Sequence, residues 1–109
     1  MNIIKFILTA RMKKDKYIEI IKKIVLNKMA KYKDVKVIFF GSRAKGEKIL
    51  RSSDVDIAID GDFKKIDLIN LKEELEEAPI PYEVDIVNLN TADEIFKQKV
   101  YKEGIFWKK

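Results

Sequence analysis

The stretch that decides the fold is Gly41-Ser42-Arg43-Ala44-Lys45-Gly46, followed a few residues later by Ser53-Asp54-Val55-Asp56-Ile57-Ala58-Ile59. The first part reads as a small turn with a hydroxyl and two cations, and the second as an apolar strand that carries two acids. Residues two apart in a strand share a face, so Asp54 and Asp56 project together while Val55 points into the core. The stretch therefore predicts a strand whose polar end lies beside a flexible turn.

Carboxylates on one face of a strand repel each other unless a cation lies between them. A pair of Mg²⁺ ions about 3.5–4 Å apart would neutralise Asp54 and Asp56 and bridge the phosphates of a nucleotide, and oxygen ligands suit Mg²⁺. Asp85 is the best candidate for a third carboxylate, because its two apolar neighbours bury the opposite side of its strand. Glu83 shares that face and is the competing candidate. Any one of these acids alone would more often be a solvated residue at a strand end.

The composition limits the chemistry that is available. The 109 residues suit a single domain spanning 1–109, and the net charge of +5 favours polyanionic partners such as nucleotides. There is no cysteine and no histidine, so disulfides, thiolate metal sites, the usual zinc sites and histidine-based acid–base catalysis are excluded. Carboxylates, lysine and tyrosine remain as reactive groups. The lack of cysteine fits a reducing cytoplasm, and no span reaches the roughly 18 apolar residues of a membrane helix.

Periodicity predicts an α/β (α+β) fold, in which helices flank a small mixed β-sheet. An amphipathic helix is expected over residues 14–32, and buried strands over 35–40, 54–60 and 82–88. A short helix is expected to begin within 42–46 and to direct its N-terminal amides at an anion, and a longer helix to cover 63–77. Thr91 is expected to cap a last helix, with Ala92, Ile95, Phe96 and Val100 along one side. The first ten residues show no clear period and could be a strand, a helical turn or a contact in a homo-oligomer.

These motifs together resemble a known family. Gly41-Ser42, then eleven residues, then Asp54-Val55-Asp56, then Val84-Asp85-Ile86 is similar to the signature of the nucleotidyltransferase superfamily that includes DNA polymerase beta. More narrowly, the two motifs resemble the minimal nucleotidyltransferases (MNT proteins), which are antitoxins encoded beside HEPN-domain partners. The resemblance covers about residues 35–88 and implies the minimal nucleotidyltransferase fold.

The resemblance implies a role for each matching residue. The candidate nucleotide-binding residues are Gly41, Ser42, Arg43 and Lys45, of which the first two would hold the triphosphate. The candidate metal ligands and catalytic residues are Asp54, Asp56 and Asp85, and Asp85 would assist deprotonation of the attacking hydroxyl. Lys45 replaces an arginine that is common at its position, which keeps the charge but loses the planar fork.

The leading hypothesis is a Mg²⁺-dependent nucleotidyltransferase that moves AMP from ATP to a hydroxyl, expected to be a tyrosine, on a HEPN toxin and so acts as its antitoxin. The alternative is a non-catalytic subunit that neutralises a HEPN ribonuclease by occupying it. The three aspartates favour the enzyme, because a subunit that only blocks its partner needs none of them. No RNP-like, helix-turn-helix or zinc pattern is present, so direct nucleic-acid binding is not expected. Because 109 residues leave no room for an acceptor domain, the hydroxyl is expected to arrive on a partner.

Overall fold

The computed structural model describes residues 15–46 and 55–109. Asp54, one of the three predicted metal ligands, lies outside the described residues, as do the opening residues 1–12. The predictions that concern them stay predictions.

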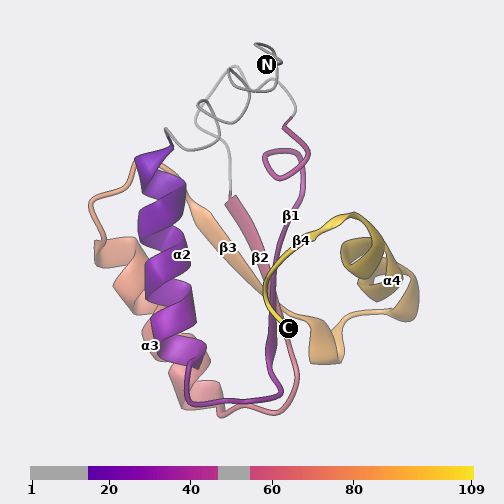
Figure 1. The fold of residues 1–109 in the computed structure, drawn as a ribbon. Helices are drawn as coiled ribbons and strands as arrows, with labels where there is room; N and C mark the ends of the chain where they lie inside the picture. The colour runs from indigo at the N-terminus through magenta and orange to yellow at the C-terminus, as the bar shows by residue number, and fades with distance from the viewer. Residues whose placement is uncertain (1–14, 47–54) are drawn as a thin grey trace, which may run out of the picture.

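The described part of the chain contains a four-stranded mixed sheet (Figure 1). Its strands are β1 (Lys36–Phe40), β2 (Val55–Asp60), β3 (Val84–Asn88) and β4 (Ile105–Lys108), in the order β3-β2-β1-β4. β1 pairs antiparallel with β2 and β4, and β2 pairs parallel with β3. The predicted mixed sheet is confirmed. β4 was not predicted, because it is a short strand that begins one residue after a helix and becomes a strand only by pairing with β1.

The helices lie on both faces of this sheet. α2 (Lys16–Met29) and α3 (Lys65–Glu77) cover one face, and α4 (Glu94–Glu103) covers the other, as Figure 1 shows. A short 3-10 helix, η1 (Leu89–Thr91), connects β3 to α4. None of the helices in the described ranges has the length and apolar character that crossing a membrane requires.

Successive residues of each central strand belong in turn to one of two hydrophobic clusters, one on each face of the sheet. Val37, Phe39 and Ile57 belong to the cluster beneath α2 and α3, whereas Ile38 and Ala58 belong to the cluster beneath α4. Since successive strand residues point to opposite faces, each strand residue can be assigned to a face by its parity. Both faces are buried, so β1 and β2 read as nearly continuous apolar runs in the sequence.

The cap of the last helix differs from the prediction. α4 begins at Glu94, and Asp93 is its N-cap, with its carboxylate accepting from the Phe96 N–H at 2.8 Å. Thr91 instead lies at the end of η1, where its hydroxyl donates to the carbonyl of Asn88. The prediction of Thr91 as the cap was wrong because η1 delays the start of the helix. Ile95, which was expected on the packed side, is 82% exposed.

The corrected cap can be tested by stability. Asp93→Ala is expected to lower the free energy of unfolding by about 1 kcal/mol, because the Phe96 N–H loses its partner at the helix start. Thr91→Ala is the matched control, with an expected effect within roughly 0.5 kcal/mol. Urea denaturation of both variants measures the difference. A larger loss for Thr91→Ala would restore Thr91 as the cap.

The buried carboxylate of Asp60 connects the sheet to α4 by a hydrogen bond and an ion pair. Asp60, at the end of β2, is 7% exposed and accepts a hydrogen bond from the hydroxyl of Tyr101 on α4. The ammonium nitrogen of Lys97 lies 3.5 Å from the same carboxylate. Burial, followed by the hydrogen bond to Asp60 and the charge of Asp60, raises the pKa of Tyr101 to about 12 from its usual 10.0.

This contact predicts a loss of stability at alkaline pH. Because the pKa of Tyr101 is higher in the folded state, its contribution to stability is complete below about pH 10 and is lost as the pH rises towards 12. The free energy of unfolding of the wild type should therefore fall more steeply over this window than that of Tyr101→Phe. Denaturant titrations at several pH values measure both slopes. Parallel slopes would show that the phenol does not titrate differently on folding.

Candidate functional site

The strand register places two of the predicted acids side by side. Asp56 on β2 is the register partner of Asp85 on β3, and neighbouring strands lie about 4.8 Å apart. Asp56 has the same parity as Ala58, and Asp85 has the same parity as Val87, so both acids belong to the α4 face. Asp56 is half-buried and Asp85 is exposed. The two carboxylates therefore share one face at the end of the sheet where β2 and β3 begin.

Gly41 makes room for one of these carboxylates. It follows the last residue of β1, Phe40, which is the register partner of Asp56. A Cβ placed on Gly41 would lie 2.4 Å from Oδ2 of Asp56, and the residue has φ of +87°. Side chains rarely adopt that backbone conformation, and no side chain could share that space with the carboxylate. Gly41 is thus needed both for the turn and for the position of Asp56.

The segment after Gly41 is a turn within the described residues, and the short helix predicted from 42–46 is not formed there. The Lys45 N–H donates to the carbonyl of Gly41 at 3.1 Å, and the Gly46 N–H donates to the carbonyl of Arg43 at 3.2 Å. Gly46 has φ of +74°, and a residue in this left-handed conformation ends a helical turn. Ser42, the predicted hydroxyl ligand, is exposed in this turn.

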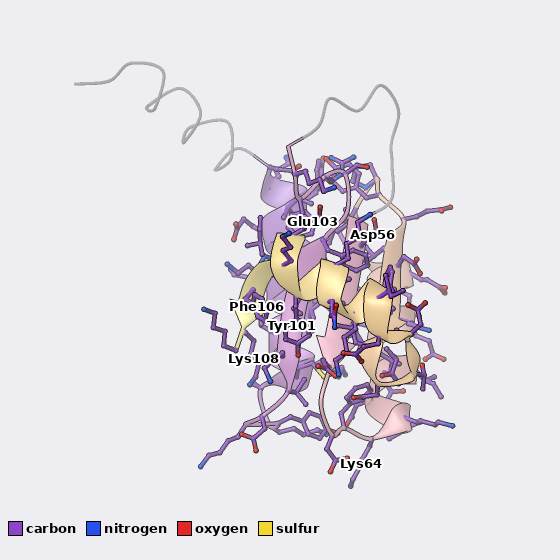
Figure 2. The ribbon with its side chains drawn as sticks, turned by 90° about the vertical axis from the view of Figure 1, so that its right-hand side faces the viewer. Asp56, Lys64, Tyr101, Glu103, Phe106 and Lys108 are labelled. Carbon is purple, nitrogen blue, oxygen red and sulfur yellow. The ribbon has the colours of Figure 1, made fainter. Side chains whose placement is uncertain are left out.

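Lys45 is connected to the far end of α4. Its ammonium nitrogen lies 3.5 Å from Oε1 of Glu103, and both side chains are 39% exposed. Figure 2 shows Glu103 and Asp56 towards the same end of the sheet, and Tyr101 farther from that end. An ion pair exposed to this extent contributes only about 0–1 kcal/mol. Lys45 can therefore exchange Glu103 for a phosphate at little cost.

Arg43 lies on the other side of the sheet from the acids. Its guanidinium carbon is 4.0 Å from the centre of the Tyr82 ring, which packs with the cluster beneath α2 and α3. Nη1 of Arg43 lies 3.9 Å from Oδ2 of Asp15, and the Tyr82 hydroxyl donates to the same oxygen at 3.2 Å. Asp15 also caps α2. Arg43 thus joins the turn to the start of α2 and to the segment that leads into β3, and its predicted role as a phosphate ligand stays a prediction.

The chemistry of the donors fits a hard divalent cation. Asp56 and Asp85 supply oxygen ligands only, and their aligned register places like charges together, which a cation would offset. The missing Cβ of Gly41 lets the Asp56 carboxylate take this position. Within residues 15–46 and 55–109 there is no group of three or more histidine, cysteine or acidic residues that could hold a metal. The predicted third ligand, Asp54, lies outside these ranges.

The sequence did not predict the residues that contact the side chains of Arg43 and Lys45 in the turn. Glu103 on α4, Asp15 at the start of α2 and Tyr82 before β3 contact Lys45 or Arg43. They are distant from the turn in the sequence, and none belongs to a recognisable motif. Only the pairing of the strands and the packing of the helices bring them to the turn, so no local signal could have identified them.

The chain is similar in sequence to a known family and in fold to several solved structures. Residues 12–107 match the family described as "Polymerase beta, Nucleotidyltransferase". No curated protein sequence matches the chain. Several solved structures share its fold. One is described as a toxin–antitoxin with AMP-PNP and is 24% identical, with 79% of this chain and 71% of that chain covered and a TM-score of 0.60.

Two further structures have similar scores. The toxin–antitoxin MntA-HepT has 20% identity, coverage of 82% and 70%, and a TM-score of 0.54. A tri-AMPylated Shewanella oneidensis HEPN toxin in complex with MNT antitoxin has 22% identity, coverage of 82% and 70%, and a TM-score of 0.56. At these identities the likeness shows a shared fold, whereas the family match spans most of the sequence. The chain therefore belongs to the polymerase beta nucleotidyltransferase family.

Proposed function

We propose that this protein transfers AMP from ATP to a hydroxyl, expected to be a tyrosine, on a HEPN-domain toxin and thereby acts as its antitoxin. The observation that carries the proposal is the aligned pair Asp56 and Asp85 beside Gly41, in a chain of a nucleotidyltransferase family. The fold shared with an MNT antitoxin in complex with a tri-AMPylated HEPN toxin supports the choice of nucleotide and partner. Residues 1–109 are proposed to act as one nucleotidyltransferase domain in the cytoplasm.

The proposed reaction is an in-line displacement at the α-phosphorus of ATP. The acceptor oxygen forms a bond to this phosphorus, the bond to the bridging oxygen of the β-phosphate breaks, and pyrophosphate leaves. The proton of the acceptor hydroxyl passes to the carboxylate of Asp85. Catalysis of this kind consists mainly of positioning and charge neutralisation, so the absence of histidine is no obstacle.

Other residues of the chain are proposed to bind the metal ions and the triphosphate. Asp56 and Asp85, with Asp54 as the predicted third ligand, would hold two Mg²⁺ ions, which would neutralise the phosphates and the developing charge. Gly41, Ser42, Arg43 and Lys45 are proposed to bind the triphosphate. Of the two basic side chains in the turn, that of Lys45 lies on the α4 side with the acids, since it contacts Glu103 at the end of α4. When the nucleotide binds, the ammonium group of Lys45 would leave Glu103 and contact a phosphate instead.

The metal requirement predicts how ATP should affect stability. ATP is expected to raise the melting temperature when Mg²⁺ or Mn²⁺ is present and to have almost no effect in EDTA, because the bare acids repel the triphosphate. A ligand at 100 times its Kd stabilises by about 2.7 kcal/mol, which gives a readily measured shift. Thermal denaturation with ATP in both buffers is the measurement. Equal stabilisation in EDTA would count against a metal site formed by these aspartates.

Mass spectrometry of the co-expressed partner tests the transfer itself. The HEPN partner should gain one or more AMP units in the presence of the wild-type protein, and the modification should remove its toxicity. A modified tyrosine would carry bulk and negative charge, which oppose the binding of RNA phosphate. If the partner carries no adduct but its toxicity is still neutralised, the protein acts by occupancy as a non-catalytic subunit.

A further inference from the structure

Within the part of the chain that the structure describes, the sheet ends at β3, next to the candidate site. β3 is the terminal strand of the order β3-β2-β1-β4, and over the described residues its only strand partner is β2. The Val55 N–H donates to the carbonyl of Glu83 at 2.8 Å, so Glu83 and the residues two and four further on direct their backbone groups towards β2. The alternate residues direct their backbone N–H and C=O groups outward. These residues are Val84, Ile86 and Asn88.

A groove runs along the same strand. It lies between β3 and α3 and has a volume of about 460 Å³. Leu75 and Ile86 give it an apolar floor, and both are almost fully buried. The described charged residues that line it are Lys72 and Glu76 on α3, Glu83 immediately before β3 and Asp85 on β3, and the last two have the parity of the α4 face. Because the two charges on the α3 side have opposite signs, the apolar floor is the feature that selects side chains for this groove.

From these two features we propose that the acceptor protein binds as an extended segment that pairs with the outer edge of β3. The main-chain groups of Val84 and Ile86 would pair with the segment, and apolar side chains of the segment would enter the groove. The apolar floor favours apolar side chains over charged ones. This proposal rests on the proposed function and specifies how that acceptor is recognised.

The pairing fixes where the acceptor hydroxyl lies. Side chains of an added strand alternate between the two faces of the sheet, as those of β3 do. The acceptor residue would share the α4 face with Asp85 and Asp56, one strand spacing of about 4.8 Å from Asp85. The residues immediately before and after it would point to the α3 face and into the groove. The acceptor is therefore a hydroxyl residue with an apolar neighbour on each side, in an extended segment.

The test uses two substitutions of one residue and two synthetic peptides. Val84→Pro removes an outward N–H, and edge strands tolerate proline where the N–H faces away from the sheet, whereas Val84→Ala shortens the side chain but keeps the N–H. The first peptide has a central tyrosine flanked by valine on both sides, and the second has proline on both sides of the tyrosine. Transfer of AMP from labelled ATP to the first peptide should be roughly tenfold lower for Val84→Pro than for Val84→Ala, as the loss of a main-chain hydrogen bond would cause. The proline-flanked peptide should be a poor acceptor for all forms of the protein.

Amide exchange measured by NMR gives a second readout that does not depend on catalysis. The first peptide, or the intact partner, should slow exchange of the Val84 and Ile86 amides, with little change at Val55, whose N–H is already bonded within the sheet. Unchanged exchange at Val84 and Ile86 with saturating partner, or equal transfer by the two Val84 variants, would overturn the edge-pairing proposal while AMP transfer to the partner still occurs. If the wild type transfers AMP to neither peptide nor partner, the proposed function itself fails, and edge recognition of an acceptor fails with it.

Discussion

Asp56→Asn is expected to lower the rate of AMP transfer at least about 100-fold. Replacing a residue that only supports a metal ligand costs 10–100-fold, and Asp56 is proposed to be a ligand itself. Asparagine has nearly the same shape, so the half-buried position next to Gly41 remains filled. The loss should therefore come from the missing charge and not from a rearranged backbone. The measurement is the transfer of label from ATP to the HEPN partner.

Stability separates a catalytic role of Asp56 from a structural one. In metal-free buffer Asp56→Asn should leave the free energy of unfolding unchanged or slightly higher, because it removes repulsion between two carboxylates in register. Asp62→Asn is the matched control, since it makes the same chemical change at an exposed acid in the turn after β2. It should retain full transfer. A lower melting temperature for metal-free Asp56→Asn would mean that this acid supports the fold.

The fold was predictable where the local signals were strong. Residues 35–40 and 54–60 are rich in β-branched residues and end at glycine; the first forms β1, which begins one residue later than predicted, and the second forms β2 over its described residues. The three-and-four spacing of apolar residues likewise predicted α2 and α3. Parity within a strand also placed Asp85 on the same face as Asp56, and the register of β2 with β3 agrees with this expectation.

The rest could not be predicted because it depends on contacts between distant parts of the chain. β4 forms only by pairing with β1, and its register shifts between Val37 and Ile38. Asp93 and Thr91 are both good cap residues by type, and the 3-10 helix decides between them. The positions of the two cations of the turn follow from partners on other elements, Glu103 for Lys45 and Asp15 for Arg43.

Gly41→Ala is expected to abolish the site by displacing a carboxylate. The new methyl group would lie 2.4 Å from Oδ2 of Asp56, so either the carboxylate or the turn has to move. The backbone at φ of +87° adds a cost of about 1–2 kcal/mol for any residue with a side chain. A ligand moved by even an ångström no longer holds its metal or the nucleotide in the productive position. Both AMP transfer and stabilisation by Mg²⁺ with ATP should therefore be lost.

Gly46→Ala separates the two effects of Gly41→Ala, which are the clash with Asp56 and the cost of the left-handed backbone. Gly46 has φ of +74°, close to that of Gly41, but among the described residues no atom lies within 4 Å of a Cβ placed on it. It should therefore share the backbone cost of about 1–2 kcal/mol, measured by urea denaturation, while keeping most of the AMP transfer. If both alanine variants lose activity equally, the turn conformation alone controls the site. If Gly41→Ala keeps full transfer, the Asp56 carboxylate does not need its position against Gly41, and its role as a metal ligand would be wrong.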